Sequence, residues 1–173
     1  MVLIEDEITL RFLPPLRAAW ALKGKQSEVP ISGRNDQRVL FGAINPQTGH
    51  CVLMGRRKAR QEDFCAILRE LRRRYRSRPI FLLLDKAPCH MARRSLALAQ
   101  ELSITLIWLP TQCPELNAMD HLWRFLKAKA AANRQFNTVE QLAEHAEQWV
   151  RNLSPKERLR LAGLLSPNQW LHL

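Results

Sequence analysis

Two short apolar runs, each next to a proline, constrain the fold of this chain more than any other feature. Residues 80–84 read IFLLL, and residues 104–109 read ITLIWL. Runs of this length that are apolar on both faces are typical of strands in the middle of a sheet that helices cover on both sides. A helical pattern over about residues 91–102 separates them. Strand, helix and strand of this length predict a right-handed parallel crossover.

The N-terminal part of the chain has the period-two pattern of antiparallel strands. Residues 2–13 place apolar side chains at alternate positions, which predicts a strand with one buried face. Residues 38–44 and 51–55 are two further apolar runs around the turn sequence NPQTGH, and they predict a hairpin. Residues 16–37 follow two prolines that end the first strand, and they are expected to form an irregular, basic connection.

Helical periodicity accounts for most of the remaining chain. It begins near Gln61, returns over about residues 115–131, and fills a helical C-terminal region over about residues 138–173. Residues 138–141 and 154–157 match the capping-box pattern of helix starts. Helices in this last region are therefore expected to cover the sheet.

The order of these elements, βββαβαβα, defines a fold class. It predicts an α/β fold with a mixed five-stranded sheet flanked by helices, which is the ribonuclease-H-like arrangement of the retroviral-integrase type. No repeat or linker interrupts the pattern. Residues 1–173 are therefore expected to form a single domain.

A large excess of positive charge points to a polyanionic partner. The formal net charge is +11 and the isoelectric point about 10.4, which favours nucleic acid over an anionic membrane surface. Arginines coat the helix predicted from Gln61, where they would either bind phosphates or form a solvated face. Neither a targeting peptide nor an apolar run of roughly 18 residues is evident, so a cytoplasmic protein without membrane partners is expected.

Three aspartates occupy positions where an acidic side chain is unexpected. Asp6 lies on the apolar face of the first strand, Asp85 ends the first buried run, and Asp120 interrupts the apolar stripe of a helix. A carboxylate at an apolar position is costly unless it is paired or binds a metal ion. The alternatives to metal are a basic or backbone partner for Asp6 and, for Asp120, an ion pair with a lysine or an arginine, Lys127 being one possible partner.

In a ribonuclease-H-like fold these three positions converge on one point. Three carboxylates repel one another unless a cation lies between them. Oxygen ligands suit Mg²⁺ or Mn²⁺ rather than Zn²⁺. Two such ions about 3.5–4 Å apart can activate a water or a 3′-hydroxyl and stabilise the leaving oxygen of a phosphodiester. The acids therefore predict a metal-dependent reaction on DNA.

Characteristic sequence blocks surround the three acids. Residues 85–90 read DKAPCH, residues 109–123 read LPTQCPELNAMDHLW, and Asp6-Glu7 precedes Trp20 and a glycine-containing loop. These blocks resemble those of mariner-related (Tc/mariner superfamily) insertion-sequence transposases of the DDE/DDD type. In that family the corresponding blocks read Asp-Asn-Ala-x-x-His and Leu-Pro-x-x-Ser-Pro-x-Leu-Asn-Pro-x-Glu-x-x-Trp. The resemblance covers essentially the whole chain.

The resemblance implies that Asp6, Asp85 and Asp120 are the catalytic, metal-binding acids, with two Mg²⁺ or Mn²⁺ ions as cofactors. Four positions depart from the family pattern: Lys86, Cys113, which stands where Ser is common, Ala118, which stands where Pro is common, and Asp120. Lys86 replaces the usual Asn and would place a cation beside the metal site, while Asp120 stands where bacterial relatives have Glu, although mariner elements use Asp. His90 matches the family's His, in a supporting or phosphate-facing role or in structural hydrogen bonding.

The resemblance also implies a transposase catalytic domain that cleaves and transfers DNA strands. Its partners would be element ends and target DNA, with a homodimer as the active complex, in the bacterial cytosol or nucleoid. No N-terminal helix-turn-helix domain is expected within this chain. The alternative is a catalytically inactive remnant that binds DNA nonspecifically or dimerises with full-length transposase. The predicted DNA contacts are Arg56, Arg57, Lys58, Arg60, Arg72, Arg73, Lys86, His90, Arg124 and Lys127.

A zinc site is a third alternative, because the chain contains suitable ligands. These are His50, Cys51, Cys89, His90, Cys113 and His121. Their spacing fits no structural zinc pattern. The cysteines are therefore expected to be reduced thiols.

Overall fold

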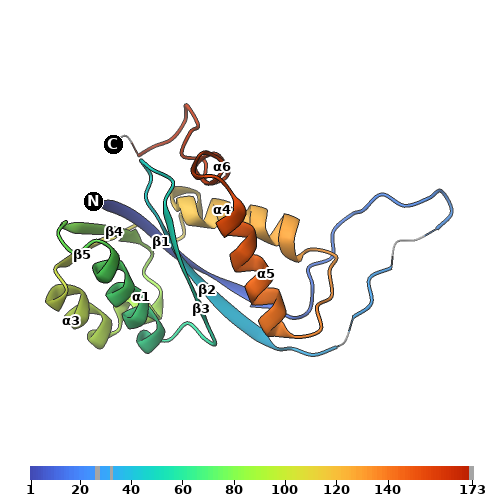
Figure 1. Ribbon diagram of the computed structural model, residues 1–173, viewed down its shortest axis with the longest axis horizontal. Helices are drawn as coiled ribbons and strands as arrows, with labels where there is room; N and C mark the ends of the chain where they lie inside the picture. The colour runs from blue at the N-terminus through green and yellow to red at the C-terminus, as the bar shows by residue number, and fades with distance from the viewer. Residues whose placement is uncertain (26–27, 32, 172–173) are drawn as a thin grey trace.

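A five-stranded mixed sheet forms the centre of the molecule, in the strand order β3-β2-β1-β4-β5 (Figure 1). The computed structural model describes residues 1–25, 28–31 and 33–171. The strands are β1 (Val2–Arg11), β2 (Gln37–Ile44), β3 (Cys51–Arg56), β4 (Ile80–Leu84) and β5 (Ile104–Trp108). β1 pairs antiparallel with β2 and parallel with β4, while β2–β3 is antiparallel and β4–β5 parallel. The predicted hairpin and the parallel crossover are both confirmed.

Helices cover the two faces of the sheet in separate groups (Figure 1). On one face, α1 (Gln61–Arg74) and α3 (Arg93–Glu101) bury apolar side chains against the strands, Phe64 and Leu98 among them. On the other face, α4 (Ala118–Leu126) and α5 (Val139–Asn152) do the same, with Trp123 only 2% exposed. The two apolar cores therefore share β1, β2, β3 and β4, which contribute alternate residues to each.

Two predicted helices differ in their boundaries. The helix predicted over 115–131 is divided into a 3₁₀ turn (η1, Pro114–Leu116), α4, and a π-helical turn (η2, Lys127–Ala131). The division comes at Asn117, which caps α4 by accepting a hydrogen bond from the Met119 amide at 3.0 Å. The helix predicted over 91–102 is preceded by a short additional turn, α2 (Pro88–Met91).

The prediction that both parallel strands are covered on both faces is wrong for the edge of the sheet. Phe81 of β4 is 38% exposed and Ile107 of β5 is 41% exposed. Both point to the face that α4 and α5 cover elsewhere, and those helices contact β1, β2 and β3 instead. Within the described residues, the β4–β5 edge therefore lacks a helical layer on this side.

The connection after β1 and the C-terminal helical region both have the general structure that the sequence predicts. Residues 12–36 form an irregular connection that extends far from the body of the molecule (Figure 1), and residues 26–27 and 32 lie outside the described part. The C-terminal region holds α5 and α6 (Pro155–Leu161), of which α6 has the expected capping box between Ser154 and Glu157. Among the described residues, no helix has the length and apolarity that crossing a membrane would require.

Candidate active site

An open pocket of about 370 Å³ lies where β4 and β5 end beside the middle of β1. All three predicted acids line it. Asp6 comes from β1, Asp85 directly follows β4, and Asp120 lies in the first turn of α4. Glu7 and Lys86 also line the pocket. The carboxyl ends of parallel strands are the usual location of ligand sites in such sheets.

Each acid is held by local structure that the sequence encodes. Asp6 shares a strand face with Ile4 and Ile8, which pack under α4, and it pairs across the ladder with Gly42. The Ala87 amide donates to Asp85 Oδ1 at 2.9 Å, which fixes the carboxylate at the start of the loop. These backbone contacts orient the two strand-borne acids toward the pocket.

Asn117 is a positioning residue that the sequence reasoning missed. It is 4% exposed, and its side-chain amide donates to the backbone oxygen of Glu5 at 3.0 Å while its oxygen caps α4. One side chain thus joins the start of the helix carrying Asp120 to the strand carrying Asp6. Its place in the Leu-Asn block, three residues before the third acid, was the available signal.

The acids differ in their electrostatic environment. Burial raises the pKa of Asp6 to about 8, with the neighbouring carboxylates of Glu7, Asp120 and Asp85 adding to the shift. A hydrogen bond from His90 instead lowers the pKa of Asp85. The pocket therefore contains a concentration of carboxylates that favours protonation of Asp6 in the absence of a cation. An all-oxygen donor set with this charge fits a hard divalent ion such as Mg²⁺ or Mn²⁺.

Arg124 is the ion-pair partner of Asp120. Its Nε and Nη2 atoms lie 2.9 and 2.8 Å from Asp120 Oδ2, one helical turn away. The alternative of a basic ion-pair partner for Asp120 is therefore confirmed, but the partner is Arg124 and not Lys127, because an i,i+4 spacing brings side chains together on a helix and this lysine lies seven residues along. Arg124 was predicted to contact DNA, but its side chain forms an ion pair with Asp120, a candidate catalytic acid.

A buried polar cluster lies behind the pocket, on the α1 side of β1. His90 and Glu5 are both 0% exposed. His90 Nδ1 lies 2.9 Å from Asp85 Oδ1, and its Nε2 lies 3.3 Å from Glu5 Oε2 and 3.4 Å from Glu7 Oε2. Although burial alone would lower it, these carboxylates raise the pKa of His90, and burial raises the pKa of Glu5.

This cluster corrects two predictions. The first strand was expected to have one buried face, but Leu3 and Glu5 are buried on the opposite face because α1 and α2 cover it. His90 was included among the predicted DNA contacts, but its ring is enclosed between β1 and Phe64 of α1, with ring centroids 4.4 Å apart. In this conformation it supports Asp85 and does not reach a phosphate.

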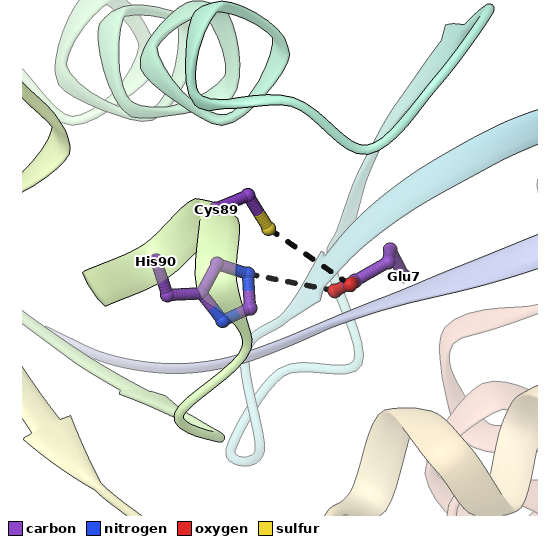
Figure 2. Close-up of side chains that lie close together, drawn as sticks. All are labelled: Glu7, Cys89 and His90. Atoms are coloured by element: carbon purple, nitrogen blue, oxygen red, sulfur yellow. Dashed lines mark hydrogen bonds and ion pairs between the residues drawn. The ribbon is translucent and has the colours of Figure 1, made fainter. Parts of the chain in front are cut away.

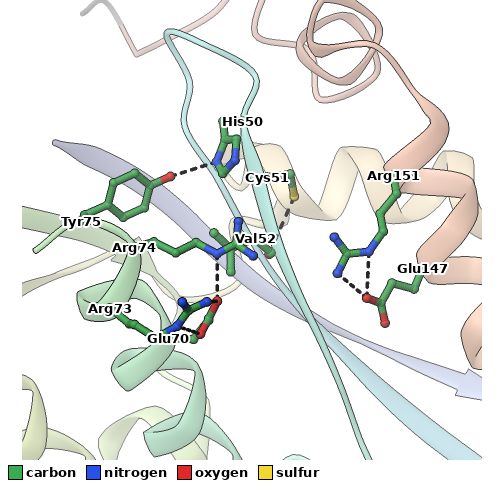
Figure 3. A network of polar contacts seen from close by, with 9 residues as sticks. All are labelled: His50, Cys51, Val52, Glu70, Arg73, Arg74, Tyr75, Glu147 and Arg151. Carbon is green, nitrogen blue, oxygen red and sulfur yellow. Dashed lines mark hydrogen bonds and ion pairs between the residues drawn. The ribbon is translucent and has the colours of Figure 1, made fainter.

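The predicted basic contacts lie at two ends of the sheet. Arg56, Arg57, Lys58 and Arg60 follow β3 at the end of the sheet where Asp85 lies, whereas Arg72 and Arg73 lie at the C-terminal end of α1, at the opposite end. Arg72 donates to the backbone oxygens of Leu102, Ser103, Tyr75 and Arg78. Arg73 and Arg74 both bind Glu70 (Figure 3), which lowers the pKa of Glu70 to about 2. These arginines therefore have structural partners.

Asp6→Asn is expected to stabilise the metal-free protein at high pH. The folded-state pKa of Asp6, about 8, exceeds the ordinary aspartate value of 3.8, so between these values the folded state holds a proton that the unfolded chain has lost. Stability should therefore fall as the pH rises from about 4 to about 8. The asparagine side chain cannot ionise, so Asp6→Asn should raise the free energy of unfolding at pH 8 by about 1–2 kcal/mol.

Urea unfolding across this pH range in chelator measures the effect. Asp36→Asn, in the exposed connection after β1, is the matched control for losing one charge and should leave the pH slope unchanged. A wild-type stability that does not vary between pH 5 and 8, with Asp6→Asn no more stable, would contradict the prediction.

The arrangement of the sheet, with acids on β1, after β4 and on the helix after β5, is that of a ribonuclease-H-like nuclease or polynucleotidyl-transferase fold. A family model described as "DDE superfamily endonuclease" matches residues 1–143. The chain belongs to this family.

Two known proteins have sequences related to this chain. "Insertion element IS630 uncharacterized 39 kDa protein" of Shigella sonnei is 28% identical over 156 residues, which cover 89% of this chain and 46% of that protein. "Uncharacterized protein y4pE/y4sA" of Sinorhizobium fredii is 28% identical over 92 residues, covering 53% of this chain and 64% of that protein.

The fold is shared with a mariner transposase. A paired-end complex of Mos1 transposase with the left transposon end superposes with a TM-score of 0.71 at 18% identity, covering 94% of this chain and 52% of that one. The Mos1 catalytic domain alone gives a TM-score of 0.65 at 16% identity and 76% coverage of that chain. This chain thus spans about half the length of the insertion-element relative and of the Mos1 chain in that complex.

Proposed function

We propose that this chain is the catalytic domain of a transposase that cleaves DNA strands and transfers them during DNA transposition. The observation that carries the proposal is the convergence of Asp6, Asp85 and Asp120 on one open pocket. Membership of the DDE superfamily endonucleases supports it. The Mos1 transposase structures, which share this fold, include paired-end complexes with Mn and with Mg, and this supports the proposal.

The three aspartates are the residues that would hold one or two Mg²⁺ or Mn²⁺ ions. When bound, such ions make a water or 3′-hydroxyl more nucleophilic and stabilise the leaving oxygen. Asp85 is already held in its ionised form by His90. Asp6 has to lose a proton before it becomes a ligand, so occupancy of the pocket should increase with pH. Lys86, at the rim, would attract a phosphate while it competes electrostatically with the ions.

The basic residues nearest the pocket end of the sheet are the preferred DNA contacts. These are Arg56, Arg57, Lys58, Arg60 and Lys86. They would bind phosphates without reading sequence, and binding should weaken steeply with salt. Lys127, in the first turn after α4, also remains a proposed DNA contact. The partners would be element ends and target DNA, acted on by a homodimer in the bacterial cytosol or nucleoid.

Strand cleavage by the purified chain tests the proposal. Supercoiled plasmid and duplexes carrying element ends are incubated with Mg²⁺ or Mn²⁺, and nicked products are quantified. Asp6→Asn, Asp85→Asn and Asp120→Asn should each lower the rate by about a thousandfold or more, because a catalytic group is lost. Asp36→Asn should cleave like the wild type.

Two outcomes would contradict the proposal. Equal cleavage by the wild type and Asp85→Asn would show that the pocket does not perform the reaction. Salt-sensitive DNA binding by a wild-type protein that neither cleaves nor binds divalent ions would instead identify an inactive DNA-binding remnant. The intact set of three converging acids does not favour that alternative.

A further inference from the structure

We propose a second, buried metal site that binds a zinc-class ion on the α1 side of the sheet, behind the acid pocket. Its ligands would be two carboxylates from β1 and two side chains from α2: Glu5, Glu7, Cys89 and His90. Figure 2 shows the last three of these side chains pointing toward one another. The site lies behind the acid pocket and differs from it in ligand chemistry; of its four ligands only Glu7 also lines that pocket.

The donor atoms of Glu7, Cys89 and His90 lie at the separations that metal ligands have, and Glu5 lies beside His90. The Nε2 atom of His90 is 3.3 Å from Glu5 Oε2 and 3.4 Å from Glu7 Oε2, and Cys89 Sγ is 4.0 Å from Glu7 Oε1. One donor atom from each of Glu7, Cys89 and His90 falls within 4.8 Å of the others. Nitrogen and oxygen ligands at roughly 2.0–2.1 Å from a tetrahedral ion would lie about 3.3 Å apart.

Several of these atoms are buried without a hydrogen-bond partner. Among the described residues, neither oxygen of Glu5, nor Glu7 Oε2, nor His90 Nε2 makes a hydrogen bond. Glu5 and His90 are 0% exposed. Burying unpartnered polar atoms costs free energy, and a buried carboxylate costs more than a neutral group. Three of these atoms, Glu5 Oε2, Glu7 Oε2 and His90 Nε2, lie close together and therefore call for a shared cationic occupant.

A proton on His90 is the simpler occupant, and the geometry argues against it. An imidazolium that donates to a carboxylate forms a bond of roughly 2.7–2.9 Å. The contacts from Nε2 to the two glutamates are longer, at 3.3 and 3.4 Å, and neither has hydrogen-bond geometry. Nδ1, in contrast, lies 2.9 Å from Asp85 Oδ1. Histidine ligands of metals characteristically donate their other ring N–H to a carboxylate in this way.

The mixture of donors selects the ion. One thiolate, one imidazole nitrogen and two carboxylates suit tetrahedral Zn²⁺ or Co²⁺, whereas Mg²⁺ and Mn²⁺ prefer oxygen ligands. Four protein ligands complete a tetrahedral coordination and leave no place for substrate, so the ion would tie α2 to β1. Because His90 also contacts Asp85, the ion would fix the orientation of that acid.

Metal analysis and cobalt spectroscopy of the full chain test the site. The protein is stripped with chelator, reloaded with Zn²⁺ or Co²⁺ and dialysed. We expect one tightly held ion per chain, and a cobalt spectrum with tetrahedral d–d bands and a thiolate-to-cobalt charge-transfer band. Cys89→Ser should remove the charge-transfer band. Cys113→Ser, a substitution of a cysteine at the mouth of the acid pocket, should leave it in place.

Two further variants separate this site from the acid pocket. Glu5→Gln should weaken zinc binding by about 10–100-fold, and Asp120→Asn should leave it unchanged. An octahedral cobalt spectrum without a thiolate band in the wild type would overturn the proposal, and so would zinc binding that Asp120→Asn abolishes. The wild-type spectrum is decisive by itself, even if Cys89→Ser or Glu5→Gln does not fold.

Discussion

His90→Ala is expected to lower the free energy of unfolding by about 3–5 kcal/mol, because it leaves buried carboxylates uncompensated. The ring of His90 is 0% exposed and contacts Glu5, Glu7 and Asp85. Burial raises the pKa of Glu5, and His90 acts against that rise. Removing it, whether it carries a proton or binds a metal ion, removes the group that offsets that buried acid. Urea unfolding at pH 7 measures the loss.

His50→Ala is the matched control for this prediction. His50 is exposed and contacts the Tyr75 hydroxyl at 3.1 Å (Figure 3), so its loss should cost no more than about 0.5 kcal/mol. Combining His90→Leu with Glu5→Met should recover much of the stability, since an apolar pair of similar volume often replaces a buried polar pair without loss. A cost for His90→Ala no larger than that for His50→Ala would refute the argument.

Gly42→Ala is expected to destabilise the fold by about 1–3 kcal/mol and to impair the acid pocket, because the added methyl group overfills the core. A Cβ at Gly42 would lie 2.5 Å from Met119 Cε and 2.6 Å from Trp123 Cζ2. The methionine end can move, but the buried indole ring cannot move without shifting α4. That helix carries Asp120, and Gly42 itself pairs with Asp6. Thermal unfolding and the plasmid-nicking rate measure the two effects.

Gly55→Ala provides the control on the neighbouring strand. The nearest atom to a Cβ at Gly55 is Glu147 Oε2 at 3.8 Å, so the methyl group fits. Its effect on stability should lie within about 0.5 kcal/mol, or be stabilising through reduced freedom of the unfolded chain. If Gly42→Ala unfolded and nicked DNA like Gly55→Ala, the close packing of α4 on β2 would not control the site.

The sequence predicted the fold well because its signals are local and periodic. Alternation in residues 2–13 and the apolar run 80–84 each determine the strand they lie in, and the crossover rule then fixes the parallel pairing. The same periodicity placed Asp6 on the face toward α4. The positions of the three acids followed from the fold, and the shared pocket agrees with them. Their catalytic role stays a prediction.

The buried cluster was not predictable in the same way, because it depends on contacts between distant parts of the chain. Glu5 was assigned to an exposed face, since its neighbours alternate with apolar residues and nothing local indicates the α2 turn that covers it. His90 meets Glu5 only after β4 has paired with β1. The start of α4 at Ala118, later than the predicted start near residue 115, was missed for a related reason. Asn117 caps α4, and its side chain also donates to the Glu5 backbone oxygen of β1, which is distant in the sequence.

The central position of β1 in the sheet affects the order in which parts of the molecule can fold. Its antiparallel neighbour β2 follows closely in the sequence, but its parallel neighbour β4 and the covering helix α4 come much later. Contacts between distant segments form slowly because the loop between them must close first. During synthesis, Glu5 would stay hydrated until α1 and α2 have packed on β1, and Asp6 until residues beyond α4 have left the ribosome. The acidic centre can therefore lose its water only in one of the last steps of folding.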